Sequence, residues 1–224
     1  MVEHLHATAQ PIGLLSDVHG DIVALDAVLD ALRRYDVGRI LVAGDLLFGG
    51  DAPLEVWRRL QSLGALCVRG VSDTALATIA ADRLEPDGAH ERARAERFAA
   101  TQRALGDLVL EQLRRLPLQL RMPMIDGREL LLVHGAPVDP TLELSIEMSD
   151  DELLARVGDD PADVVVCGAT HVPFHRQLDG LDVLNVGSVG EAPGPTDARV
   201  AHFTVLRPRM DGPEIIQEWV ELGR

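Results

Sequence analysis

Acidic and imidazole side chains follow directly after several short apolar runs of the chain. An apolar run that stops at an Asp or a His is typical of a buried strand that carries a polar side chain to the edge of a sheet. In open α/β sheets the carboxyl ends of neighbouring strands meet at one crevice, where ligands bind. The residues placed in this way are Asp17 and His19 after Ile12–Ser16, Asp45 after Arg39–Ala43, His134 after Glu129–Val133, and His171 after Asp163–Cys167. Four distant segments are therefore predicted to meet at one site.

Carboxylate and imidazole groups in one site favour a transition metal. Asp17 and His19 are two residues apart, so a tightly turning backbone can aim both side chains at one ion. Mixed oxygen and nitrogen ligands suit manganese, iron or zinc, with nickel as a further candidate, whereas calcium and magnesium prefer oxygen alone. Each fragment by itself has another interpretation, because an Asp often caps a helix and a lone His is usually a packing or surface residue.

The elements that must position these residues alternate between strands and helices in the first part of the chain. Further apolar runs at Ala65–Val68 and Leu181–Val186 predict buried strands. Within Asp21–Tyr35 the apolar positions follow one helix face with Asp21 as N-cap, and Asp51-Ala52-Pro53 begins a second helix. This alternation predicts an α/β fold.

The stretch from about 82 to 117 differs from its surroundings because it is rich in Arg, Glu and Ala. It predicts a helical insertion between core strands, which could overhang the site. A helix is predicted at Asp150–Val157, and the runs at 200–206 and 214–220 are strand-like. No repeat, low-complexity tract or long linker divides the sequence, which predicts one domain over residues 1–224.

The composition limits the classes of partner. A formal net charge of −15 opposes an extended nucleic-acid surface or docking onto an anionic membrane, because Lys and Arg hold such partners. A small phosphorylated substrate remains compatible, since metal ions can supply positive charge locally. The first ten residues do not resemble a secretory signal and no apolar run reaches membrane-spanning length, which predicts a cytoplasmic location. The oligomeric state is left open, with a dimer as one option.

The ordered series of motifs resembles the calcineurin-like metallophosphoesterase family. That family reads Asp-x-His, Gly-Asp, Gly-Asn-His-Asp or a close variant, a strand-end His, and Gly-His-x-His. The matching segments are Asp17-Val18-His19, Gly44-Asp45, Gly70-Val71-Ser72-Asp73, His134 and Gly168-Ala169-Thr170-His171, followed by Asn185-Val186-Gly187-Ser188-Val189-Gly190. The resemblance implies a four-layer αββα sandwich, with two mixed sheets flanked by helices. It also implies two metals, the first held by Asp17, His19, Asp45 and His171.

The resemblance also marks what this chain lacks. The second metal would take Asp45 and His134 together with an Asn at position 71 and a His at position 169, where this chain has Val71 and Ala169. Neither side chain has a lone pair, so we expect one firmly bound ion and a second that is weak or absent. Ser72 replaces the family's catalytic His, and a serine hydroxyl is a poor general acid. This leaves Asp73 and His134 as candidate catalytic residues, and Arg69 and Ser72 as candidate substrate-binding residues; Asp73 could equally cap the helix that follows.

Two functions remain in competition. The first is a phosphomonoesterase or phosphodiesterase of reduced activity, in which water or hydroxide attacks phosphorus with the help of the held metal. The second is a catalytically silent protein that uses the fold as a binding or regulatory module. A nucleophile elbow is disfavoured because Val186 stands where Gly-x-Ser-x-Gly needs its first glycine before Ser188, and the chain has no Walker loop or dinucleotide-binding glycine motif.

Overall fold

Two mixed β-sheets lie face to face in the computed structural model, which describes residues 2–194 and 198–223. The first sheet has six strands in the order β1-β5-β6-β7-β9-β8, and the second has five in the order β11-β10-β2-β3-β4 within these residues. Their bounds are β1 Val2–His4, β2 Ile12–Leu15, β3 Arg39–Val42, β4 Leu66–Cys67, β5 Gln119–Pro123, β6 Glu129–Val133, β7 Val164–Cys167, β8 Phe174–Leu178, β9 Leu181–Asn185, β10 Val200–Arg207 and β11 Glu214–Glu221.

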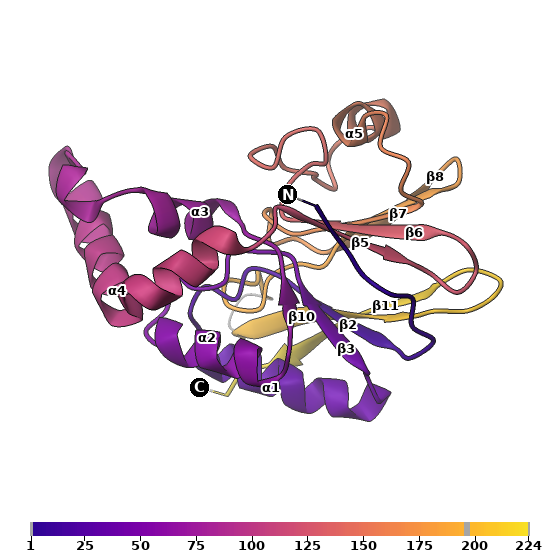
Figure 1. Cartoon of the computed structure of the whole chain (residues 1–224), viewed down its shortest axis with the longest axis horizontal. Coiled ribbons are helices and arrows are strands. Elements are labelled where there is room, and N and C mark those ends of the chain that lie inside the picture. Colours follow the sequence, from indigo (N-terminus) through magenta and orange to yellow (C-terminus); the bar gives the residue numbers. More distant parts are fainter. Residues whose placement is uncertain (1, 195–197, 224) are drawn as a thin grey trace.

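Helices cover the outer face of each sheet. Figure 1 shows α1 (Ile22–Leu32) and α2 (Pro53–Ser62) against the five-stranded sheet and α5 (Asp150–Val157) over the six-stranded sheet. Neighbouring strand residues alternate between layers, so Leu14 faces the core between the sheets while Leu15 faces the core under α1. The expected four-layer αββα sandwich is therefore confirmed.

Parallel pairing brings the strand ends to one edge. In the five-stranded sheet β2, β3 and β4 run parallel, with Leu15 opposite Val42. In the six-stranded sheet β6, β7 and β9 run parallel, with Leu132 opposite Val166. The loops that carry the candidate ligands leave the carboxyl ends of these strands, which is the placement expected from the sequence.

The helical insertion lies beyond the ends of the sheets, where Figure 1 shows α3 and α4 projecting to one side. Helix α3 (Val71–Thr78) follows β4, a short 3₁₀ turn covers Ala81–Arg83, and α4 covers Gly88–Arg115. Gly106 interrupts α4 with φ of 70°, a backbone conformation that favours glycine, so α4 consists of two helical segments. Among the described residues, none of the helices is both long enough and apolar enough to cross a membrane.

Candidate metal centre

The loops that carry the candidate ligands share an unusual backbone conformation. Asp17, His19, Asp45 and His171 have φ between 51° and 62°, and Ala169 has φ of 70°. Residues other than glycine rarely adopt this left-handed region, and each does so at a cost of about 1–2 kcal/mol. Backbone hydrogen bonds between the loops hold the conformation, from Asp17 N–H to the Gly44 carbonyl (3.0 Å) and from His19 N–H to the Asp45 carbonyl (3.0 Å). The surrounding fold thus imposes the side-chain directions at this site.

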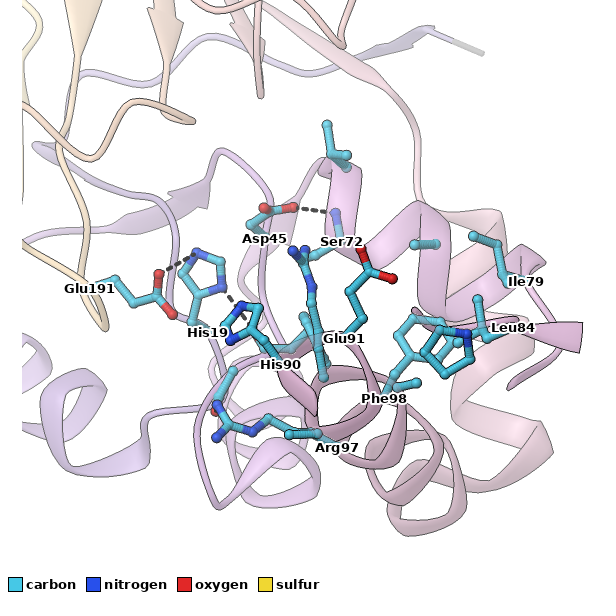
Figure 2. Close-up of a pocket in the computed structure, with 18 of the residues that line it drawn as sticks. His19, Asp45, Ser72, Ile79, Leu84, His90, Glu91, Arg97, Phe98 and Glu191 are labelled. Atoms are coloured by element: carbon cyan, nitrogen blue, oxygen red, sulfur yellow. Dashed lines mark hydrogen bonds and ion pairs between the residues drawn. The ribbon is translucent and has the colours of Figure 1, made fainter. Parts of the chain in front are cut away.

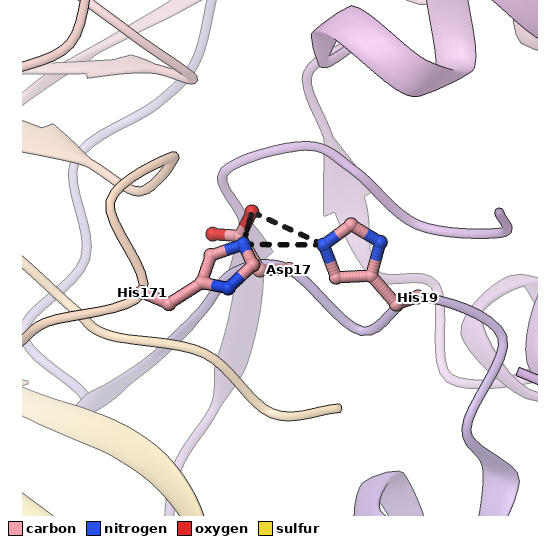
Figure 3. A group of neighbouring side chains, drawn as sticks. All are labelled: Asp17, His19 and His171. Carbon is pink, nitrogen blue, oxygen red and sulfur yellow. Dashed lines mark hydrogen bonds and ion pairs between the residues drawn. The ribbon is translucent and has the colours of Figure 1, made fainter. Parts of the chain in front are cut away.

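A first group of donor atoms consists of Asp17, His19 and His171, drawn in Figure 3. His171 Nε2 lies 3.2 Å from Asp17 Oδ1 and 3.3 Å from His19 Nε2, and His19 Nε2 lies 3.7 Å from Asp17 Oδ1. Ligand atoms of a tetrahedral ion with bonds of about 2.1 Å lie about 3.4 Å apart. The three atoms therefore have the mutual spacing of ligands to one ion.

Hydrogen bonds around this group leave its donor atoms directed inward. His19 Nδ1 lies 2.7 Å from the Phe48 carbonyl and donates to it, which leaves Nε2 as the nitrogen that a metal ion can take. Asp17 Oδ1 is buried and accepts no hydrogen bond of normal geometry within the described residues. A buried carboxylate oxygen without a hydrogen bond of normal geometry, facing the Nε2 atoms of two imidazoles, calls for a cation, and the donor set fits a divalent transition metal.

Protons and metal ions compete for these atoms. Burial lowers the pKa of His19, but the Asp17 carboxylate, the Phe48 carbonyl and the Glu191 carboxylate outweigh it and raise the pKa to about 9. Asp17 also raises the pKa of His171, against a smaller effect of burial. For Asp17 itself burial raises the pKa, but the contacts with His171 and His19 and the charge of His134 hold it well below its usual range. The site therefore attracts positive charge.

A second group of donor atoms consists of Asp17, Asp45 and His134, whose ligand atoms lie within 4.8 Å of one another. His134 Nε2 is 3.5 Å from Asp45 Oδ2, while His134 Nδ1 lies 2.7 Å from the Ala43 carbonyl and so is fixed as the protonated nitrogen. Asp45 Oδ1 accepts a hydrogen bond from Ser72 N–H at 2.9 Å. Asp17, rather than the expected Asp45, is the residue common to both groups in this geometry.

The two positions that depart from the family pattern lie at this second group. Val71 is 50% exposed at the start of α3 and lines the cavity next to Asp45. Ala169 N–H donates to Asp17 Oδ2 at 3.1 Å, so its backbone contacts the site although its side chain offers no donor. The second group therefore has three side-chain donors, one of which also belongs to the first group.

Asp73 and Arg69, the candidate catalytic and substrate-binding residues, are not among the residues that line the cavity. Asp73 is fully buried, and its two oxygens accept hydrogen bonds from Leu46 N–H (3.0 Å) and Gly70 N–H (3.1 Å). Burial and the negative charge of Asp45 raise the pKa of Asp73 to about 7. It joins the start of α3 to the Asp45 loop, which is the geometry of the helix-capping alternative.

The Arg69 guanidinium donates to the Arg114 carbonyl at the end of α4 (2.6 Å), and Arg69 does not line the cavity. The expected contact of Arg69 with substrate therefore has no geometric support. Ser72 does line the cavity, and its buried hydroxyl has no hydrogen-bond partner within the described part of the chain.

A cavity of about 840 Å³ opens from the metal centre towards α4, and Figure 2 shows part of its lining. Its volume lies in the range of small-molecule sites, about 300–1,000 Å³. Glu191 lines it, and Glu191 Oε2 lies 3.9 Å from His19 Nε2 and 3.8 Å from His171 Nδ1. We did not anticipate Glu191 from the sequence, although it directly follows the Asn185–Gly190 turn that resembles the family pattern.

The comparisons with known proteins agree with this architecture. The description of the matching family is calcineurin-like phosphoesterase superfamily domain, and the match covers residues 11–207. The uncharacterized protein MJ0912 of Methanocaldococcus jannaschii is 25% identical over 181 residues, which are 80% of this chain and 69% of that protein.

Two solved structures extend the comparison to the fold. A metallophosphoesterase from Sphaerobacter thermophilus is 25% identical with a TM-score of 0.72, over 94% of this chain and 88% of that one. The hypothetical protein PH1004 from Pyrococcus horikoshii is 20% identical with a TM-score of 0.78, over 99% and 88%. With the family match extending over most of its length and the expected donor residues gathered at the strand ends, the chain belongs to the calcineurin-like phosphoesterase superfamily.

Proposed function

We propose that the protein is a metal-dependent hydrolase of phosphoric esters that works with one firmly held divalent transition metal. The observation that carries this proposal is the convergence of His19 Nε2, His171 Nε2 and the unpartnered Asp17 Oδ1 beside an open cavity. A structural ion would be enclosed by its ligands, whereas catalytic sites keep an open position. Manganese, iron and zinc are the candidates, with nickel as a further one.

In this proposal each residue of the centre has a limited task. Asp17, His19 and His171 hold the ion, while Asp45 and His134 face a neighbouring position that a weakly held second ion or a phosphoryl oxygen can take. When bound, a divalent ion supplies Lewis acidity to a phosphoryl oxygen and makes a nearby water molecule more acidic. The water oxygen bonds to phosphorus while the bond from phosphorus to the ester oxygen breaks, and the water proton ends on solvent or on the departing oxygen.

The leaving group determines how well this site can work. Ser72 is the side chain at the position of the family's catalytic His, and its hydroxyl is a weak acid. We therefore expect hydrolysis to be fastest for esters whose oxygen leaves without protonation, such as aryl phosphates. Alkyl phosphates, which need a proton donor, should react much more slowly.

The test is a screen of turnover with p-nitrophenyl phosphate and bis(p-nitrophenyl) phosphate in the presence of Mn, Fe, Co, Ni or Zn. The comparison is between the unaltered protein, the Asp45→Asn variant and the Asp107→Asn variant. Asp107 is an exposed residue of α4 outside the cavity, so Asp107→Asn controls for the loss of one carboxylate. Turnover that exceeds Asp45→Asn by at least about tenfold and survives Asp107→Asn supports the enzyme.

A catalytically silent binding protein is the alternative, favoured by one observation. Positions 71 and 169 offer no donor side chain, and the Asp73 carboxylate is engaged by two backbone N–H groups. A silent protein still binds one metal through Asp17, His19 and His171. Stoichiometric metal binding without turnover above Asp45→Asn would therefore replace the enzyme by this alternative.

A further inference from the structure

The cavity that opens from the metal centre has two chemically different ends. Figure 2 shows His19, Asp45 and Glu191 at one end and Ile79, Leu84 and Phe98 at the opposite end, with Glu91 of α4 between them and Arg97 of α4 below the first end. The first end presents imidazole and carboxylate groups that suit a metal and a phosphoryl group. The opposite end presents aliphatic and aromatic carbon.

An apolar stripe on α3 connects the two ends. Val71, Ala75 and Ile79 are four residues apart, so they lie on one face of the helix, and all three line the cavity. Ile79 directly follows the last residue of α3. Val71 is 50% exposed and Ile79 is 43% exposed, which leaves carbon surface open to the cavity. Because the N–H of Ser72, the residue after Val71, donates to Asp45 Oδ1, the apolar wall begins beside the metal centre.

The opposite wall belongs to α4 and carries two guanidinium groups. Arg94 and Arg97 are three residues apart, so they share one helix face, and both line the cavity together with His90. The Arg94 guanidinium lies 6.0 Å from the centre of the Phe48 ring, and Arg94 forms no ion pair within residues 2–194 and 198–223. The Phe48 carbonyl accepts from His19, and the Phe48 ring packs on Phe98 with 5.7 Å between the ring centres, so Arg94 lies beside a residue that contacts both ends of the cavity.

Acidic groups also line the cavity, but one of them is engaged elsewhere. Glu91 accepts a hydrogen bond from Asp87 N–H at the start of α4 (2.7 Å), and Glu191 lies beside His19 and His171. Glu85 and Asp45 are the other two acidic residues of the lining. Arg94 is thus a cation that faces the cavity without a carboxylate partner in the described residues.

We propose that this cavity selects phosphoesters whose organic group is a large, flat, apolar ring system. The phosphoryl group lies at the His19 and Asp45 end within reach of Arg94, and the ring system packs along Val71, Ala75 and Ile79 against Phe98. The proposal rests on the proposed function for the orientation of the substrate. It adds the class of organic group, which the metal centre alone does not determine.

A larger ring system should bind measurably more tightly than a smaller one. A pocket gains about 10- to 200-fold in specificity for one additional methylene that it can enclose, and a second fused ring adds several carbons. Because the cavity is open to solvent on one side, we expect roughly a tenfold to thirtyfold preference for a naphthyl over a phenyl group. Removing the Arg94 charge should weaken the binding of the phenyl and the naphthyl ligand about equally, since both carry the same phosphoryl group.

The experiment measures binding and turnover separately. Binding of phenylphosphonate and 2-naphthylphosphonate, which cannot be hydrolysed, is measured by calorimetry with the metal-loaded protein. Turnover is measured with phenyl phosphate and 2-naphthyl phosphate, whose leaving groups have similar acidity. The variants are Ile79→Ser, with Leu108→Ser as its control, and Arg94→Ala, with Arg92→Ala as its control; Leu108 and Arg92 are exposed residues of α4 outside the cavity.

The proposal predicts a naphthyl preference of at least about tenfold in binding, reduced by Ile79→Ser and unchanged by Leu108→Ser. Arg94→Ala should weaken both phosphonates several-fold while Arg92→Ala leaves them unchanged. Equal binding of the two phosphonates, or a preference that Ile79→Ser does not alter, would overturn it. Naphthyl-selective binding without any turnover would support the proposed selectivity of the cavity and refute the proposed hydrolysis. Turnover without naphthyl selectivity would support the hydrolysis and refute the selectivity.

Discussion

Restoring donors at positions 71 and 169 is the most direct perturbation of this metal centre. The variant combines Val71→Asn and Ala169→His, which would give the group of Asp17, Asp45 and His134 two further ligands. Val71 is half exposed and faces the cavity, so an amide of similar size has room there. Ala169 already adopts a left-handed backbone conformation, which His tolerates better than most residues. The combined cost in folding free energy should therefore stay within about 1 kcal/mol.

The gain in metal affinity can be worked from the number of ligands. A zinc site with four protein ligands gains about 10–16 kcal/mol in total, or roughly 3–4 kcal/mol per ligand. Two added ligands would provide about 7 kcal/mol in ideal geometry, and loops that have not adapted to them should realise about half. The second ion should then bind about 3–4 kcal/mol more tightly, which is a few hundredfold in Kd.

The assay is the number of ions bound per chain after equilibrium dialysis, followed by competition titration to obtain each Kd. The doubly substituted protein should bind two ions where the unaltered protein binds one, and each single variant should fall between them. Val23→Asn is the matched control, because Val23 is an exposed valine in the first turn of α1. If the double variant, correctly folded, still binds one ion with unchanged Kd, the assignment of positions 71 and 169 to the second ion is wrong.

Three further predictions concern the same centre. A metal ion must displace a proton from His19, whose pKa is raised to about 9 in the ion-free protein. The affinity for manganese should therefore rise by up to about tenfold per pH unit for each displaced proton, and it should level off above that pKa. A Kd that does not change with pH would contradict this prediction. Glu191→Gln should lower the affinity for the ion at Asp17, His19 and His171 about threefold to tenfold, as measured by calorimetry, because it removes a nearby negative charge. Glu85→Gln is the control, since it changes another residue of the cavity lining and should leave this affinity unchanged. Ala169→Gly should raise Tm by about 1–4 °C, because glycine removes the cost of about 1–2 kcal/mol that Ala169 has in the left-handed conformation. The greater conformational entropy of glycine in the unfolded chain cancels part of this gain. An unchanged or lower Tm would show that the Ala169 conformation is not strained.

The sequence was informative wherever an apolar run ended in a polar residue. Such runs predict buried parallel strands, and their ends must meet at one edge, which is how Asp17, Asp45, His134 and His171 could be placed together. Strands β5 and β8, in which apolar and polar residues are mixed, could not be predicted in this way. β5 has prolines at 117 and 123 beside it or within it, and Arg121 at its centre, so its period is obscured. β8 lies at the edge of its sheet and reads as a polar segment.

The partners of individual side chains were harder to predict than their positions. Asp73 follows a glycine motif, but its pairing with Leu46 N–H depends on a loop 27 residues away. Arg69 carries a charge near the site, but the Arg114 carbonyl at the end of α4 attracts its guanidinium. Glu191 has no periodic or motif signal of its own, and only the fold of the Asn185–Gly190 turn brings its carboxylate near His19 and His171.

The candidate ligands come from both sheets, so an ion held by them would connect the two sheets. Asp17 and Asp45 extend from the five-stranded sheet, whereas His134 and His171 extend from the six-stranded sheet. Between these ends the layers adhere through apolar side chains such as Leu14, whose contacts have little directional preference and resist sliding weakly. A metal bound by Asp17 and His171 is a cross-link between the two layers. Without the ion, the two sheets should therefore slide more easily over each other at this edge, while each sheet keeps its own fold.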